Sequence, residues 1–207
     1  KDQEGSFLVG LLAAKASKTA KVGFVGGMDI PLIRPFACGY VQGVKFGNKS
    51  AEVFQNMTGT TGAAWNDPVR GGELAKSQID QGADVILPVA GQVGEGAARA
   101  ALDSGRASVI WVDSDGYDTL GPEFRPILLT SVLKNTGDAV VEIVKSSIDD
   151  TFDNSPFVGS LENGGVDIAP FHDLAAKVSA ELSAEIDQLR ADIIADTVVV
   201  TSPSTPK

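Results

Sequence analysis

Short apolar segments and amphipathic helical segments alternate along this chain, at a spacing of roughly 30 residues. A strand followed by a helix at such a spacing is the pattern of βαβ units, which build parallel sheets with right-handed crossovers. We therefore expect an α/β fold with a doubly wound parallel sheet. The expected strands are 21–26, 51–57, 84–88, 108–112 and 127–132, with a short strand within 157–168 and a last strand at 197–200. The expected helices are 4–16, 31–46, 68–81, 95–104, 135–149 and 173–195.

The segment Lys21–Gly43 connects the first expected strand to its helix through Gly26 and Gly27. We expect a turn at these glycines, because glycine adopts positive φ without strain and lets the backbone approach a bound molecule. The helix behind the turn would present free N–H groups, and Asp29 is expected to cap it. Open α/β sheets bind ligands beyond the carboxyl ends of their strands, so the candidate site lies at that edge.

Helix 68–81 has clear signals at both ends. Asp67 is expected to be its N-cap, and Pro68 its first residue, because proline lacks the N–H group that would go unpaired there. Gly82 is expected to end the helix in a left-handed conformation.

Composition excludes several classes of protein. The 207 residues carry a net charge of −10 and no cluster of Lys or Arg, which argues against a nucleic-acid surface and against electrostatic binding to anionic membranes. The single cysteine, Cys38, excludes an internal disulfide and a Cys-based zinc site, and we expect a buried structural thiol. The single histidine, His172, is expected to be a cap or a surface residue. The longest apolar run, Phe7–Ala14, is too short to span a bilayer.

Several motifs follow one another in an order that is typical of one family. They are GSFLVGLLAA, KVGFVGGMDIPLIRPFACGYVQG, WNDPVRGGELAKSQIDQGADVILPVAG, VDSD, LLTSVLKN and NGGVDIAPFHD. Together they closely resemble the basic membrane protein family, which comprises nucleoside-binding lipoproteins of bacterial ABC importers. The resemblance covers nearly the whole chain, and the Gly-Gly-Met-Asp-Ile-Pro segment is its most specific part.

The resemblance implies a type I periplasmic binding protein fold, in which two doubly wound lobes close on a ligand. Mapped onto that fold, the first lobe is incomplete in this chain. Residues 1–17 resemble the last helix of lobe one, 18–115 most of lobe two, 126–155 the return into lobe one, and 156–200 a C-terminal segment packed mainly on lobe two, followed by a disordered tail at 201–207.

This mapping has a physical consequence for the two segments assigned to lobe one. Without that lobe, helix 4–16 has no partner and strand 127–132 has no sheet to join, so both would expose apolar surface. We therefore expect the native polypeptide to be longer at its N-terminus. The resemblance also implies a periplasmic or other extracytoplasmic protein, which is either soluble or attached to the membrane through a lipid anchor that is absent from this chain.

Two candidate site residues are indicated by the sequence itself. Trp65 lies in a loop of small residues with few neighbours to bury it, so a role in stacking on a base is favoured over a place in the core. Asp113 ends strand 108–112 at the ligand edge, where its carboxylate can accept two hydroxyl hydrogen bonds from a sugar. Asp115 is an alternative for that role, and capping of a turn is the alternative for Asp113.

The resemblance adds three further candidates. Phe36 matches a family position whose ring packs against the nucleobase, with core packing as its alternative. Lys134 matches a ligand-binding lysine that can donate to sugar oxygens and pair with Asp113, although an exposed lysine is the ordinary interpretation. Gly91 matches a residue whose backbone approaches the ligand, with a simple turn as the alternative.

The favoured function is a receptor that binds a purine nucleoside, or a related base or sugar, between two lobes and delivers it to an ABC transporter permease. This reading includes no catalytic residue, metal or cofactor. A ligand-sensing domain or a sugar-binding protein of the same fold are alternatives. An enzyme acting on a phosphorylated substrate is disfavoured, because the sequence has no Walker motif, no GxSxG motif and no Cys–His pair.

Overall fold

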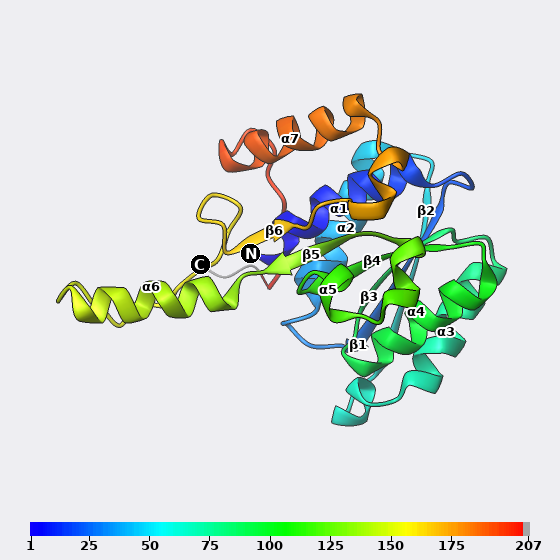
Figure 1. The fold of residues 1–207 in the computed structure, drawn as a ribbon, viewed down its shortest axis with the longest axis horizontal. Coiled ribbons are helices and arrows are strands. Elements are labelled where there is room, and N and C mark those ends of the chain that lie inside the picture. The colour runs from blue at the N-terminus through cyan, green and yellow to red at the C-terminus, as the bar shows by residue number, and fades with distance from the viewer. Residues whose placement is uncertain (205–207) are drawn as a thin grey trace.

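A computed structural model of the chain describes residues 1–204, in which six strands form one sheet (Figure 1). The strand order is β2-β1-β3-β4-β5-β6; the first five strands are parallel, and β6 pairs antiparallel with β5. The expected α/β fold with a parallel sheet is therefore confirmed. The strands are β1 Lys21–Met28, β2 Glu52–Gly59, β3 Val85–Val89, β4 Ser108–Asp113, β5 Leu128–Lys134 and β6 Val166–Ile168.

Helices cover both faces of the sheet, as a doubly wound fold requires. The α-helices are α1 Asp2–Ala16, α2 Arg34–Gly47, α3 Pro68–Asp80, α4 Gln92–Ser104, α5 Gly116–Thr119, α6 Thr136–Ile148 and α7 Ala180–Ile194. Three 3₁₀ helices join them: η1 Gly62–Trp65, η2 Pro122–Ile127 and η3 His172–Lys177. One hydrophobic core contains α1, α2 and α7, and the other contains α3 and α4.

The ends of α3 are formed as its sequence predicts. The Asp67 side chain accepts a hydrogen bond from the backbone N–H of Arg70, and Pro68 is the first helical residue. Gly82 follows the C-cap with a φ of 105°, a left-handed conformation that favours glycine.

The expected turn at Gly26 and Gly27 is wrong. Strand β1 continues through both glycines to Met28, and neither has positive φ. Their small size serves packing instead: a Cβ on Gly26 would collide with the side chain of Met57, and one on Gly27 would collide with the ring of Trp65.

The expectation that helix 4–16 lacks a partner is also wrong. Residues 3–14 of α1 are all buried, and α1 packs tightly along α2. Glycines allow this approach, since a Cβ on Gly43 would overlap the carbonyl oxygen of Phe7, and one on Gly10 would overlap that of Tyr40. The expectation that strand 127–132 has no sheet to join is wrong as well, because β5 lies between β4 and β6 in the sheet. One sheet thus takes in segments that the mapping divided between two lobes.

The C-terminal region differs from its expected elements. The helix expected at 173–195 is divided into η3 and α7, which begins after the N-cap Ser179. Residues 197–200 form no strand. In the tail expected to be disordered, the carbonyl oxygen of Thr201 accepts a hydrogen bond of 2.7 Å from the Gln42 amide. The expected disorder at residues 205–207 lies outside the described residues.

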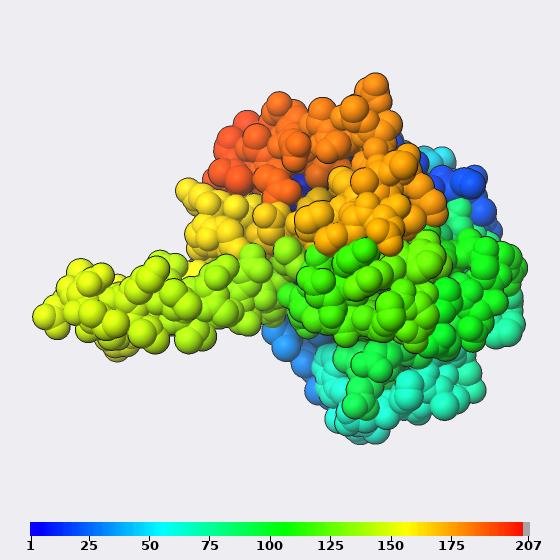
Figure 2. Space-filling model, viewed as in Figure 1, coloured from blue at the N-terminus to red at the C-terminus, as the bar shows by residue number. Residues whose placement is uncertain are grey.

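Helix α6 stands apart from the rest of the molecule. It projects from the end of β5 as an isolated arm (Figures 1 and 2), and none of its residues is buried. Five large apolar side chains on it are exposed: Val140, Val141, Ile143, Val144 and Ile148. Over residues 1–204, no helix combines the length and apolar character that a bilayer span needs.

Candidate ligand-binding edge of the sheet

The predicted site residues follow the carboxyl ends of parallel strands. Asp113 and Lys134 are the last residues of β4 and β5, and Gly91 lies just after β3. Trp65 ends η1, which follows β2, and Phe36 lies in the first turn of α2, after β1. Because all these strand ends meet at one edge of the sheet, the structure places the five predicted residues along that edge.

The strand order 2-1-3-4-5 reverses direction between β1 and β3, which makes that position the topological switch point of the sheet. Trp65 lies there. Its ring covers Gly27 near the end of β1, and its carbonyl oxygen would be 3.4 Å from a Cβ on Gly91. Gly91 has a φ of 57° and a ψ of −132°, a backbone conformation that favours glycine. The switch point thus combines a half-buried indole with the glycine backbone of β1 and of the loop after β3.

Lys134 is held between an acid and an aromatic ring. Its Nζ lies 3.4 Å from Oδ2 of Asp2 and 5.7 Å from the centroid of the Phe36 ring, within cation–π range. The Phe36 residue is only 2% exposed, so its ring is part of the core in this structure. Phe36 therefore supports the lysine from the core, and its contact with a nucleobase stays a prediction.

Asp113 ends β4 with a φ of 67°, in the left-handed region. The Asp113 residue is exposed at the edge of the sheet. The protein atoms around its carboxyl group nevertheless raise the pKa of that group by desolvation. The charge of Lys134 lowers this pKa, and the charge of Asp2 raises it. The predicted Asp113–Lys134 ion pair is absent among the described residues, because Lys134 pairs with Asp2 instead.

Other candidates have structural roles. Asp115, the alternative to Asp113, is the N-cap of α5 and bonds His172. Asp29 does not cap a helix; its carboxylate accepts from Nε of Arg34 at 2.9 Å, and α2 begins at Arg34. Cys38 is a half-buried free thiol in α2.

Sequence reasoning missed Asp2. This residue starts α1 beside Lys134, and its side chain is only 13% exposed. The available signal was an acidic residue in the first turn of a helix, which is common enough at helix N-termini that it did not single out Asp2.

A hollow of about 250 Å³ opens beside Asp2 and Lys134, and it is bounded by the start of α6 and by residues 157–159. A larger hollow, of about 970 Å³, lies between α3, α4 and η2 and contains none of the five predicted residues. No group of three metal-ligating side chains converges anywhere in residues 1–204.

Solved structures share this fold. An ABC transporter solute-binding protein from Aeropyrum pernix K1 superposes with a TM-score of 0.81 at 24% identity, over 98% of this chain and 65% of that one. A transcriptional activator of the comK gene from Bacillus halodurans gives a TM-score of 0.80 at 22% identity, over 97% of this chain and 65% of that one. These likenesses show the periplasmic-binding-protein fold.

The family follows from sequence comparison. The family model described as "ABC transporter substrate-binding protein PnrA-like" matches residues 1–203, and this chain belongs to that family, which is one of binding proteins and not of enzymes. The nucleoside-binding protein BmpA of Lactococcus lactis is 31% identical over 97% of this chain, and basic membrane protein A of Borreliella afzelii is 32% identical over 96%. The chain spans 58% of the length of each of these two relatives.

Proposed function

We propose that this chain supplies one wall of a cleft that binds a purine nucleoside for uptake by an ABC transporter. The observation that carries the proposal is the arrangement at the carboxyl edge of the sheet: an indole at the switch point, with a carboxylate and an ammonium group on the next two strand ends. A flat apolar base and a polyhydroxylated sugar need these two kinds of partner. The nucleoside-binding relative from L. lactis supports this choice of ligand.

In this proposal Trp65 stacks on the base. Gly27 lies under one side of its ring and Gly91 beside it, so the ring is fixed by backbone and not by flexible side chains. Stacking between a base and an aromatic side chain contributes about 1–3 kcal/mol. The backbone of Gly91 then lies within reach of the ligand, and the buried Phe36 ring forms a wall behind Lys134.

The sugar is bound by Asp113 and Lys134. Asp113 accepts from two sugar hydroxyl groups, and the Lys134 ammonium donates to a sugar oxygen. Asp2 is a third member of this part of the site. Its carboxylate Oδ2 lies 3.4 Å from Nζ of Lys134 and limits the conformational freedom of the lysine side chain before the ligand binds.

The cleft is completed by a second lobe, which the greater length of the relatives supports. Helix α6 packs on that lobe through its exposed valines and isoleucines, which would otherwise remain in water. Residues around 134 and 158, where the chain leaves and rejoins the body, then form part of the hinge on which the lobes close. The receptor works outside the cytoplasm and passes its ligand to a permease.

The test is a titration of Trp65 fluorescence in the intact protein with inosine. The chain has two tryptophans, so the Trp111→Phe variant leaves Trp65 as the only indole of residues 1–207 and serves as the reference. We expect inosine to quench this signal, and Trp65→Ala to weaken binding measured by calorimetry by about tenfold or more. Unchanged affinity in Trp65→Ala would refute the stacking role.

A further inference from the structure

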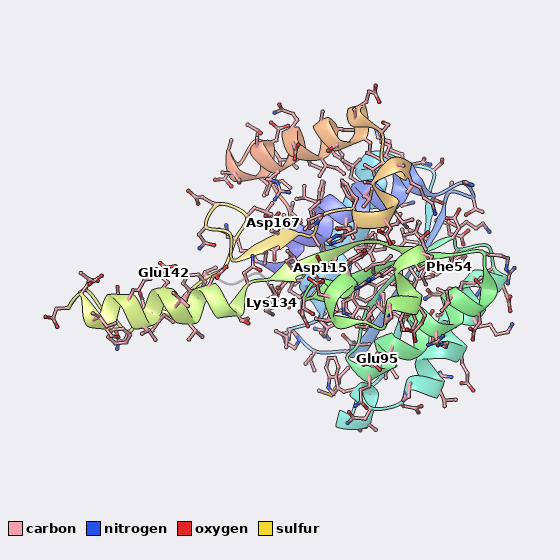
Figure 3. All side chains as sticks on the ribbon, viewed as in Figure 1. Phe54, Glu95, Asp115, Lys134, Glu142 and Asp167 are labelled. Carbon is pink, nitrogen blue, oxygen red and sulfur yellow. The ribbon has the colours of Figure 1, made fainter. Side chains whose placement is uncertain are left out.

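His172, the only histidine of the chain, is bonded to the segment that carries Asp113. Its Nε2 lies 2.7 Å from Oδ2 of Asp115, and both side chains are mostly buried, at 25% and 20% exposure. Asp115 is two residues beyond Asp113, the predicted sugar-binding acid (Figure 3 labels Asp115). His172 comes from η3, far away in the sequence.

The imidazole is fixed by an aromatic stack. The His172 ring lies parallel to the ring of Tyr117, with centroids 4.1 Å apart and planes at 14°. The guanidinium of Arg125 lies 4.1 Å from the same Tyr117 centroid and therefore occupies the opposite face. The Tyr117 hydroxyl donates to Asp173 at 3.1 Å. Three segments, α5, η2 and η3, are joined in this way.

The turn that precedes this stack in the chain is strained. Asp113 has a φ of 67°, and the N–H of Ser114 donates to the carbonyl oxygen of Val112 at 2.8 Å, which closes a γ-turn around Asp113. γ-Turns with positive φ are rare and costly, and they persist only where the surroundings fix them. His172 is itself left-handed, with a φ of 41°.

Asp115, two residues beyond Asp113, joins this turn to α5 and to η3. Its Oδ1 accepts from the N–H of Tyr117 at 3.0 Å, and its Oδ2 bonds His172. The next residue, Gly116, donates its N–H to the buried hydroxyl of Ser131 on β5 at 2.9 Å. The two carboxylate oxygens thus have separate tasks, one within α5 and one toward η3.

We propose that His172 is a positioning residue for ligand binding: it holds Asp115, and through it keeps the Asp113 carboxylate at the edge of the cleft. The proposal rests on the proposed function for the role of Asp113. The charged and titratable groups around this stack are Asp115, which is the N-cap of α5, Tyr117 on α5, Arg125 on η2 and Asp173 on η3. They make the imidazole a bridge between an acid and a ring, and not an isolated surface group.

Two substitutions separate the hydrogen bond from the stack. His172→Phe keeps a ring on Tyr117 but has no donor for Asp115, whereas His172→Gln keeps a donor. Tyr117→Phe is the matched control, since it retains the ring stack and loses only the hydroxyl bond to Asp173.

The first measurement is amide hydrogen exchange over residues 112–118 without ligand. We expect about tenfold faster exchange in His172→Phe, as from loss of one hydrogen bond to a charged group, with recovery in His172→Gln and no change in Tyr117→Phe. Exchange in His172→Phe equal to that of wild type would overturn the proposal, whatever the affinities are.

The second measurement is inosine affinity of the intact protein in a double-mutant cycle with Asp113→Asn. We expect His172→Phe to weaken binding by about tenfold in the wild-type background, but not further in Asp113→Asn, because the two residues act as a unit. Fully additive losses would overturn the proposal. Faster exchange in His172→Phe, together with a wild-type protein that binds no nucleoside, would support the positioning of the Asp113 segment by His172 and refute the proposed function.

Discussion

Gly27 lies directly under the indole of Trp65: a Cβ on this glycine would be 2.6 Å from Cε3 and 2.9 Å from Cη2 of the ring. The contact is with a rigid aromatic ring, so a methyl group cannot be accommodated by a small rotation. The position of the proposed stacking platform is therefore set by a residue on the neighbouring strand β1.

We predict that Gly27→Ala displaces Trp65 and weakens nucleoside binding by about tenfold or more, with a loss of about 1–3 kcal/mol in the free energy of unfolding. Calorimetry and urea denaturation measure the two effects. Gly62→Ala, in the same η1 segment, is the control, because a Cβ there meets nothing within 4 Å. If both alanines behave alike, the contact does not position Trp65.

Asp113→Asn is predicted to reduce affinity while not lowering stability. Asparagine also tolerates a left-handed φ, so the turn is retained. Burial raises the pKa of the Asp113 carboxyl, so between the unfolded and folded pKa values the folded chain binds more protons than the unfolded one. The Asp113 contribution to stability therefore falls as pH rises through that window, and the asparagine variant lacks this fall.

Urea denaturation from about pH 4 to about pH 7 tests the direction in which the Asp113 contribution to stability changes with pH. The difference in free energy of unfolding between Asp113→Asn and wild type should grow in favour of the variant as pH rises. Asp118→Asn, exposed on α5, provides a matched control. A difference that shrinks with rising pH would show that the folded chain stabilises the Asp113 carboxylate.

Lys134→Gln is predicted to weaken nucleoside binding by about tenfold, because it removes the proposed donor to the sugar and leaves Asp2 without its partner. Calorimetric titration measures the effect. Lys76→Gln, which removes an exposed partner of Asp80 on α3, should leave affinity unchanged. Equal affinities for wild type and Lys134→Gln would remove the lysine from the site.

Gly43→Ala is predicted to destabilise the fold by about 1–3 kcal/mol, because the added methyl group forces α1 away from α2. Gly72→Ala on α3 is the comparison, since its Cβ would approach Gly96 only to 3.4 Å, and alanine favours helix. Thermal unfolding should show a lower midpoint for the first variant and an equal or higher midpoint for the second.

The parallel sheet and most of the element positions could be predicted from the sequence, because the alternation of strand and helix and the caps of α3 are local signals. The packing partners of α1 could not be predicted in this way. Its burial on nearly every side arises from contacts with α2, α7 and β5, which local pattern does not encode. The glycines of β1 were misread for a related reason: a turn and a close approach of a distant ring both require glycine, and only the position of Trp65 distinguishes them.

The candidate site was predictable in part. The rule that ligands bind at the carboxyl ends of parallel strands indicated Asp113, whereas Lys134 and Gly91 were indicated by the family resemblance. The burial of Phe36 and the Asp2–Lys134 pair depend on how α1 and α2 pack, so they were visible only in three dimensions. The role of His172 also depends on tertiary structure, because its partner lies 57 residues away.

The most direct test of the proposed function is calorimetric titration of the intact protein with adenosine, guanosine, inosine, cytidine and ribose. We predict saturable binding of the purine nucleosides and little or no heat with ribose, because stacking on Trp65 requires a base. Binding of ribose as tight as that of the nucleosides, or no binding of any purine nucleoside, would refute the proposed function.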